Sequence, residues 1–178
     1  MTRISKLLRE RISFRSVNRR GAIGYDPGLQ RHHLLPTQLL GSRCFGPMFE
    51  TIGPDRAGFE DFRRNGLLLP ANDSAAIRMG LPLHRGPHQT YNAMVIERVG
   101  QIEMAWSRTK LQSVDAALEQ ALMQLSLLQK ALRRRLLDQS MRRISLNRRD
   151  PFGKLVDYAE LDAMAETLWG ATGSALGE

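Results

Sequence analysis

The stretch RHHLLP at residues 31–36 decides the fold that we expect for this chain. Glycine and proline residues break the chain over residues 21–28, so the two adjacent histidines begin an extended segment that ends at Pro36. The two other histidines, His84 and His88, are four residues apart. Two close pairs of histidines offer metal ligands beside a potential base, and metal-assisted hydrolysis of a phosphodiester needs these groups.

A second short strand is predicted further along the chain. Asn65-Gly66 reads as a tight turn that leads into an apolar run at residues 67–69, which Pro70 ends. The two extended segments, residues 32–35 and 67–69, can pair as antiparallel strands. We therefore expect a small two-stranded sheet that carries the histidine pair.

Three helices are expected after the second strand. Asp73 caps a short helix that runs to Met79, and a longer helix begins near Pro87 and carries His88 and Tyr91. From about residue 110, apolar side chains recur at steps of three and four, as in a long amphipathic helix. These residues are Leu111, Val114, Leu118, Leu122, Leu125, Leu128, Leu132 and Leu136. The predicted fold class is α+β, with a small core, additional helices and a long amphipathic C-terminal helix.

Length and composition favour one domain. A chain of 178 residues with 42% hydrophobic content can bury one core. The single cysteine, Cys44, excludes an internal disulfide framework and a four-cysteine zinc knuckle, and it is most simply a buried small side chain. No apolar run is long enough to span a bilayer, and arginines stand where a secretory signal would be apolar. We expect a cytoplasmic protein, with delivery elsewhere as a toxin as the alternative.

Positive charge is concentrated in two segments. The net charge is +8, residues 1–20 carry seven basic side chains against one carboxylate, and residues 130–149 carry eight against one. Clustered basic side chains favour a polyanionic partner such as DNA or RNA, although a membrane surface or an acidic protein would also fit. We divide the chain into a basic amphipathic N-terminal arm (1–23), a core (24–99), a long helical extension with a basic end (100–149) and an acidic C-terminal helix with a frayed tail (150–178).

The ordered motifs resemble a known family. These motifs are the histidine pair before Leu34-Leu35-Pro36, the Asn65-Gly66 pair before an apolar strand, and residues 83–88, which read Leu-His-Arg-Gly-Pro-His and precede Tyr91-Asn92. Together they resemble the AHH nuclease domain, a branch of the HNH/endonuclease VII superfamily that is common among bacterial polymorphic toxins. The resemblance covers residues 24–99. The family has a small residue before the histidine pair, and this chain has Arg31 there.

The resemblance implies a ββα-metal core, in which two strands present the histidine pair and a helix supplies ligands from the other side. His32 would bind one divalent ion, and His33 would be the general base that activates water. Because neighbouring strand residues point to opposite faces, His33 needs a twist of the strand to reach the same substrate. The side chain or the backbone carbonyl of Asn65 would hold one ring nitrogen of His33.

The remaining ligands have alternatives. Gly86-Pro87 separates His84 from His88, so His84 is expected in a loop and His88 in the first helical turn. We favour His32 and His88, with His84 as the third ligand and Asn92 as the alternative. Zinc, nickel, manganese or magnesium would suit such a site. Arg31 and Arg85 are candidates for binding phosphate, whereas Tyr91 is interpreted as a packing residue.

These observations lead to a functional hypothesis. We expect a metal-dependent endonuclease that hydrolyses DNA or RNA, either in a housekeeping role or as a toxin with an acidic immunity protein as partner. The alternative is a basic nucleic-acid-binding protein without catalytic activity, in which the histidines hold a structural metal. The leucine stripe is most simply part of the molecule's own core, with homodimerisation through the long helix as the lesser interpretation.

Overall fold

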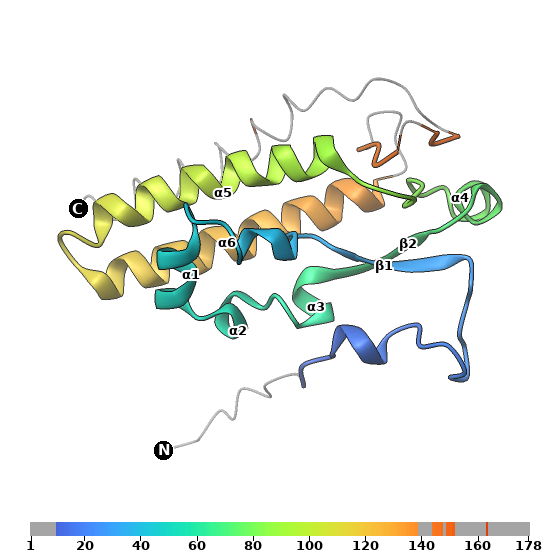
Figure 1. The fold of residues 1–178 in the computed structure, drawn as a ribbon, viewed down its shortest axis with the longest axis horizontal. Helices are drawn as coiled ribbons and strands as arrows, with labels where there is room; N and C mark the ends of the chain where they lie inside the picture. Colours follow the sequence, from blue (N-terminus) through green and yellow to red (C-terminus); the bar gives the residue numbers. More distant parts are fainter. Residues whose placement is uncertain (1–9, 139–143, 148, 152–162, 164–178) are drawn as a thin grey trace, which may run out of the picture.

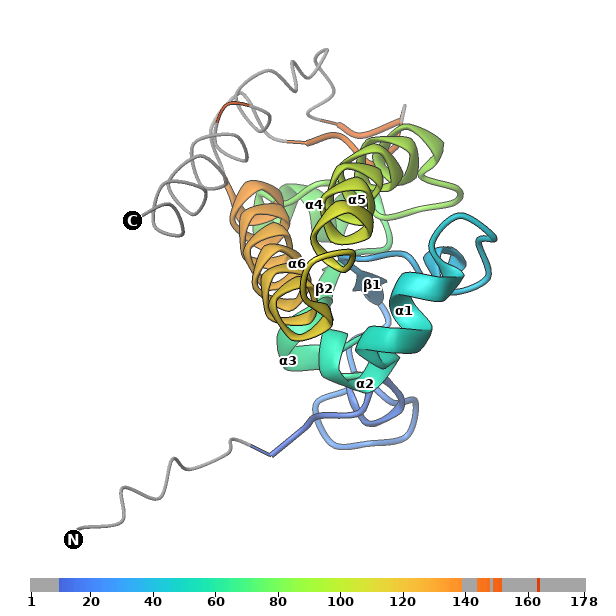
Figure 2. The same ribbon diagram turned by 90° about the vertical axis from the view of Figure 1, so that its left-hand side faces the viewer.

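The computed structural model describes residues 10–138, 144–147, 149–151 and 163. Two long antiparallel helices, α5 (Gln89–Thr109) and α6 (Val114–Leu137), lie side by side along the molecule (Figure 1). A group of short helices packs against this pair, and a two-stranded sheet lies beside them toward the end of the molecule where α5 begins (Figure 1 and Figure 2). The short helices are α1 (Gly46–Ile52), α2 (Pro54–Ala57) and α3 (Phe62–Asn65).

The sheet confirms that two antiparallel strands carry the histidine pair, but the first strand lies earlier in the chain than the predicted residues 32–35, because the amide of Leu35 bonds to the side chain of Asn65 and not to the other strand. Strand β1 (Leu29–His33) runs antiparallel to β2 (Gly66–Pro70), with His32 opposite Leu67. The predicted tight turn at Asn65-Gly66 is wrong, because Asn65 ends helix α3 and Gly66 has an extended backbone with φ of −108°. Glycine is needed there for space, since a Cβ atom on Gly66 would lie 2.2 Å from the ring of Phe62. The motif thus marks a close contact between helix and strand.

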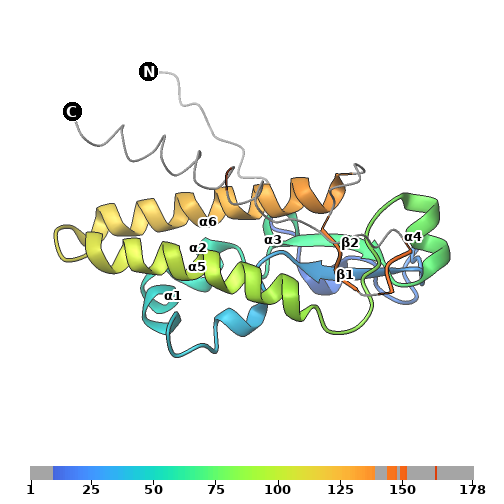
Figure 3. The same ribbon diagram turned by 90° about the horizontal axis from the view of Figure 1, so that it is seen from above.

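The helices that follow agree with the sequence, apart from their caps. Helix α4 covers Asp73–Met79 as predicted, but its N-cap is Asn72, whose side chain accepts a hydrogen bond from the amide of Ala75 at 2.9 Å. Helix α5 begins at Gln89, and His88 is its N-cap. Figure 3 shows that α5 begins near the sheet and ends at the far end of the molecule. His88 therefore precedes the first turn in which it was predicted to lie.

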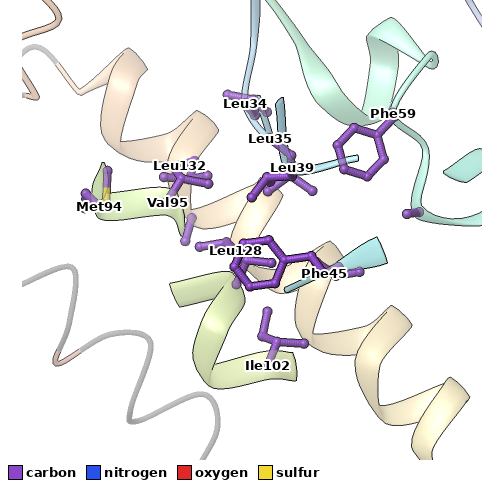
Figure 4. Packing of buried hydrophobic residues seen from close by; sticks show 14 of the residues in the cluster. Leu34, Leu35, Leu39, Phe45, Phe59, Met94, Val95, Ile102, Leu128 and Leu132 are labelled. Carbon is purple, nitrogen blue, oxygen red and sulfur yellow. The ribbon is translucent and has the colours of Figure 1, made fainter. Parts of the chain in front are cut away.

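The core confirms most of the leucine stripe. Leu125, Leu128, Leu132 and Leu136 of α6 are buried, and Figure 4 shows side chains of α6 packing with Leu34, Leu35 and Leu39. Two predicted members are exposed, Leu111 by 83% and Val114 by 57%. Helix α5 continues to Thr109, and Ser113 is the N-cap of α6. Leu111 therefore lies in the turn between the two helices, and Val114 is the first residue of α6, ahead of the buried part of the stripe. The stripe therefore packs inside the molecule.

The N-terminal segment differs from the expected amphipathic arm. Residues 10–23 contain a short 3-10 helix, η1 (Phe14–Ser16), and an antiparallel bridge from Ser13 to Asp61, and Phe14 is 5% exposed. The amide of Phe62 donates to the carbonyl of Ile12 at 2.7 Å, so this part of the chain pairs with the α3 region and cannot continue as a helix. Residues 1–9 and most of the predicted acidic helix at 150–178 lie outside the described residues.

Two further expectations concern exposure. Cys44 was expected to be buried, but it is exposed and carries a free thiol, because it lies in the loop that precedes α1. None of the described helices is both long enough and apolar enough to cross a membrane.

Candidate metal centre

Three histidines from three separate parts of the chain meet at the sheet. His32 comes from β1, His84 from the loop after α4, and His88 from the start of α5. One ligand atom from each histidine lies within 4.8 Å of the others. The ring centroids are 4.9 Å apart for His32 and His84, and 4.4 Å apart for His84 and His88. This spacing allows all three imidazoles to bind one ion, with coordination positions left open.

His32 is the most enclosed of the three. Its side chain is 3% exposed, and its Nε2 is buried without a hydrogen-bond partner in the structure. The ring of Tyr91 lies 4.9 Å away, and the Tyr91 hydroxyl donates to the carbonyl of Leu34 at 2.7 Å. Tyr91 is therefore a packing residue, as predicted. A buried imidazole nitrogen without a partner is costly unless it binds something, and a cation would satisfy it.

His84 is held at both its backbone and its ring. Its amide donates to the carbonyl of Pro70 at 2.7 Å, and its Nδ1 lies 3.2 Å from Oε1 of Gln30. With the amide oxygen of Gln30 as acceptor, Nδ1 carries the proton and Nε2 is left for a metal. Sequence patterns did not single out Gln30, although it lies two residues before His32 on the same face of the strand.

Burial keeps the three imidazoles neutral. The pKa of His32 is well below its usual value, mainly because of burial and then because His84 and His88 lie close. Burial also lowers the pKa of His84 to about 4. Burial lowers the pKa of His88, although the backbone of Leu146 acts in the opposite direction. Neutral imidazole is the form that binds metal ions, so the donor set fits a divalent cation.

His33 lies on the other face of β1. Its ring stacks on the ring of Phe14, and it is half-buried. Burial lowers its pKa, the charge of Glu60 raises it, and the charge of Arg31 lowers it. Arg31 is exposed and its guanidinium donates to the carbonyl of Phe14 at 2.7 Å. A long side chain is thus accommodated before the histidine pair, because it points away from the three clustered histidines.

Asn65 holds the chain just beyond His33. Its Oδ1 accepts from the amide of Leu35 at 2.7 Å, and its Nδ2 donates to the carbonyls of Leu35 and Phe59. Its own carbonyl accepts from the amide of Leu34 at 2.8 Å. These hydrogen bonds go to the backbone around residues 34–35 and 59, and none of those in the described part of the chain joins Asn65 to the ring of His33, where one was predicted.

Gln129 is a site-supporting residue that sequence reasoning missed. It lies on α6, is 3% exposed, and donates from Nε2 to the carbonyl of Ala57 at 3.1 Å. The same nitrogen lies 3.4 Å from Oδ1 of Asn65. The signal available in the sequence was a glutamine on the same helical face as the leucine stripe, because a buried side-chain amide needs hydrogen-bond partners. Helix α6 thereby supports the end of β1.

Two predicted residues lie at the edge of the centre. Arg85 is exposed in the loop between His84 and His88. Asn92 is half-buried one turn after His88, and its amide donates to the His88 carbonyl at 2.8 Å. The histidine cluster forms without Asn92.

A depression lined by arginines lies beside β1. Its lining includes Tyr25, Gln30 and four arginines: Arg15, Arg19, Arg20 and Arg31. Asn18 fixes this loop, because its Nδ2 donates to the carbonyls of Asp26 and Leu29, and it adopts a left-handed φ of 45°. Among the described residues, the ion pairs are formed by other arginines.

Comparison with known proteins agrees with this geometry. A family model described as a nuclease family of the HNH/ENDO VII superfamily with conserved AHH matches residues 13–132. The match extends beyond residues 24–99 at both ends, so that it includes Phe14 and Gln129. No curated protein and no solved structure gives a match.

Proposed function

Because the chain belongs to the AHH nuclease family of the HNH/ENDO VII superfamily, we propose that it hydrolyses phosphodiester bonds of DNA or RNA with one divalent metal ion. The convergence of His32, His84 and His88 is the observation that carries this proposal. Zinc, nickel, manganese and magnesium are the candidate ions.

Each residue has a distinct task. The three clustered histidines would hold the ion through neutral ring nitrogens, and the bound ion would supply positive charge to the scissile phosphate and the leaving oxygen. His33 is the general base and takes a proton from the attacking water at a ring nitrogen. Phe14 sets the plane of the His33 ring, and Asn65 fixes the backbone that follows it. Asn92 remains the alternative ligand.

The arginines hold the substrate. Arg85, in the loop between His84 and His88, binds a phosphate next to the scissile bond, and Arg31, on the face of β1 that carries His33, binds a second phosphate. The depression of Arg15, Arg19 and Arg20 extends this basic surface along β1. Phosphate contacts carry no base identity, so we expect weak sequence preference.

Cleavage of supercoiled plasmid and of a labelled RNA, with each of the four metals, tests the proposal. We expect metal-dependent cutting by the wild type and loss of cutting in both His33→Ala and His88→Ala. The His33→Ala variant should still bind metal and nucleic acid, whereas His88→Ala should lose metal. If no metal supports cutting of either substrate although both are bound, the chain is instead a binding protein with a structural metal.

A toxin role is a further proposal that would use the same activity. Expression of the wild type in bacteria should then stop growth, and His33→Ala should be harmless. An acidic immunity protein would protect by covering the basic surface. The leucine stripe of α6 packs against the core, so a homodimer would have to form through another surface. Equal growth with both forms would contradict the toxin role and leave the nuclease proposal standing.

A further inference from the structure

The loop that carries two of the three metal ligands is fixed at three consecutive residues. The amide of Leu83 donates to Oδ2 of Asp150 at 3.2 Å, and the amide of His84 donates to the carbonyl of Pro70 at 2.7 Å. The carbonyl of Arg85 accepts from Nδ2 of Asn147. Two of these three bonds come from residues that follow α6, so a segment distant in sequence holds the loop.

This segment, residues 144–147 with 149–151, is here called the strap. Ile144 is fully buried and Leu146 is 4% exposed, and both belong to the main core. Within the strap, the amide of Asp150 donates to the carbonyl of Asn147 at 3.0 Å, and the amide of Arg149 donates to its Oδ1 at 2.8 Å. The side chains of Asn147 and Asp150 are therefore held by a compact turn when they reach the loop.

The strap also reaches the third element of the centre. The backbone of Leu146 lies close enough to the ring of His88 to raise its pKa against the effect of burial, and Nδ1 of that ring is buried without a hydrogen-bond partner. The strap thus contacts the chain at residues 83 and 85 and at the His88 ring, on both sides of Gly86-Pro87.

The loop needs such support. Residues 81–88 have no helix or strand of their own, and Gly86 adopts a φ of 82°. Ordering a backbone of this kind costs conformational entropy that the loop cannot offset alone. The strap lies beyond residue 132, where the match to the family model ends. It is therefore an addition to the part of the chain that resembles the family.

We propose that the strap is a positioning element of the metal centre: Asn147 and Asp150 hold His84 and His88 in the arrangement that binds the ion. This inference rests on the metal site of the proposed function. The strap contributes no ligand itself. Its residues act by fixing the loop backbone on which His84 and His88 stand, so their loss weakens metal binding more than it weakens the fold.

Titration of the full-length, metal-free chain with Co²⁺ tests this role, with the visible absorption bands of bound Co²⁺ as the readout. We expect Asn147→Ala and Asp150→Ala each to lower the affinity by about 10- to 100-fold and to change the bands, as losses of ligand-orienting partners do. Asp150→Asn keeps an acceptor oxygen for the Leu83 amide and should restore most of the affinity. Arg149→Gln, an exposed neighbour, is the matched control and should bind like the wild type.

Circular dichroism and thermal unfolding without metal identify variants that fail to fold. If Asp150→Ala is one of them, Asn147→Ala and Asp150→Asn decide the result. Wild-type affinity and unchanged bands in Asn147→Ala, with clear Co²⁺ binding by the wild type, would overturn the strap's role alone. Absent Co²⁺ binding by the wild type, or binding unaffected by His88→Ala, would overturn the metal centre itself and the strap proposal with it.

Discussion

The rings of Phe14 and His33 are stacked, with centroids 3.8 Å apart and planes inclined by 5°. Phe14 is itself held by the edge of Phe62, whose centroid is 5.1 Å away. The proposed general base is thus oriented by the N-terminal segment of the chain. An aromatic face fixes the plane of an imidazole and leaves its ring nitrogens free for hydrogen bonds.

Phe14→Leu should slow cleavage without removing the metal. Leucine keeps apolar bulk at this position but offers no flat face, so the His33 ring is no longer held in one plane. We expect the cleavage rate at saturating substrate to fall by about 10- to 100-fold, since small misplacements of catalytic groups have effects of this size. Co²⁺ affinity should be unchanged. A wild-type rate in Phe14→Leu would show that the stack does not orient the base.

Asn65→Ala should destabilise the fold. The substitution leaves the buried amide of Leu35 and the carbonyls of Leu35 and Phe59 without their partner. We expect the free energy of unfolding to fall by about 3 kcal/mol, measured by urea denaturation. The half-buried Asn92 provides a control, and Asn92→Ala should cost less than about 1 kcal/mol in the absence of metal. Equal losses in the two variants would contradict the role given to Asn65.

The metal-free protein should lose stability in mild acid. The pKa of His84 falls from 6.5 in the unfolded chain to about 4 in the folded one, and the pKa values of His32 and His88 are lowered too. As pH falls through this window, the unfolded chain takes up protons that the folded chain does not, so the free energy of unfolding decreases. Above pH 6.5 the stability that depends on neutral histidines in the folded chain is fully present.

Urea denaturation in a chelator, repeated across that pH range, checks the expectation. Carboxylates also titrate in acid. The variant His84→Gln isolates the part of the pH dependence that comes from His84, because the glutamine side chain does not take up a proton in this pH range. The variant should show a shallower decline than the wild type. Parallel curves would mean that His84 contributes nothing to the pH dependence.

Replacing two arginines of the depression should weaken nucleic-acid binding in a salt-dependent way. In the His33→Ala background, which prevents cleavage, Arg19→Ser with Arg20→Ser should reduce the slope of log affinity against log salt by about 2, one for each lost phosphate contact. Fluorescence anisotropy of a labelled oligonucleotide measures this slope. Arg43→Ser with Arg108→Ser removes the same charge from exposed positions near α1 and at the end of α5. Identical slopes in the two double variants would exclude the depression as the contact surface.

Local patterns in the sequence predicted much of this fold. Strand pairing and helices α4 and α6 follow from alternation, helical spacing and turn residues, which short stretches of chain carry. The grouping of His32, His84 and His88 followed from the resemblance, since spacing alone left Asn92 as an alternative. The amphipathic arm expected over residues 1–23 is not helical around Ile12, because pairing with the α3 region satisfies the backbone there.

Contacts between distant segments could not be predicted in this way. The stack of Phe14 on His33 joins the N-terminal segment to β1, and Gln129 reaches Asn65 from a helix far along the chain. Asn147 and Asp150 meet the ligand loop only after α6 has crossed the molecule. Nothing in the local spacing of these residues marks their partners, because the meeting depends on how the long helices pack.

Strand β1 divides its side chains between two faces, with Gln30 and His32 toward the histidine cluster and Arg31 and His33 toward Phe14. Inserting or deleting one residue within Leu29–His33 would therefore exchange the ligand and the base together, whereas a substitution would remove one of them. The register of the strand therefore decides which face, and so which task, each of its side chains has. Deletion of one other residue in this strand would be as damaging to cleavage as loss of both histidines, even though both histidines would still be present in the chain.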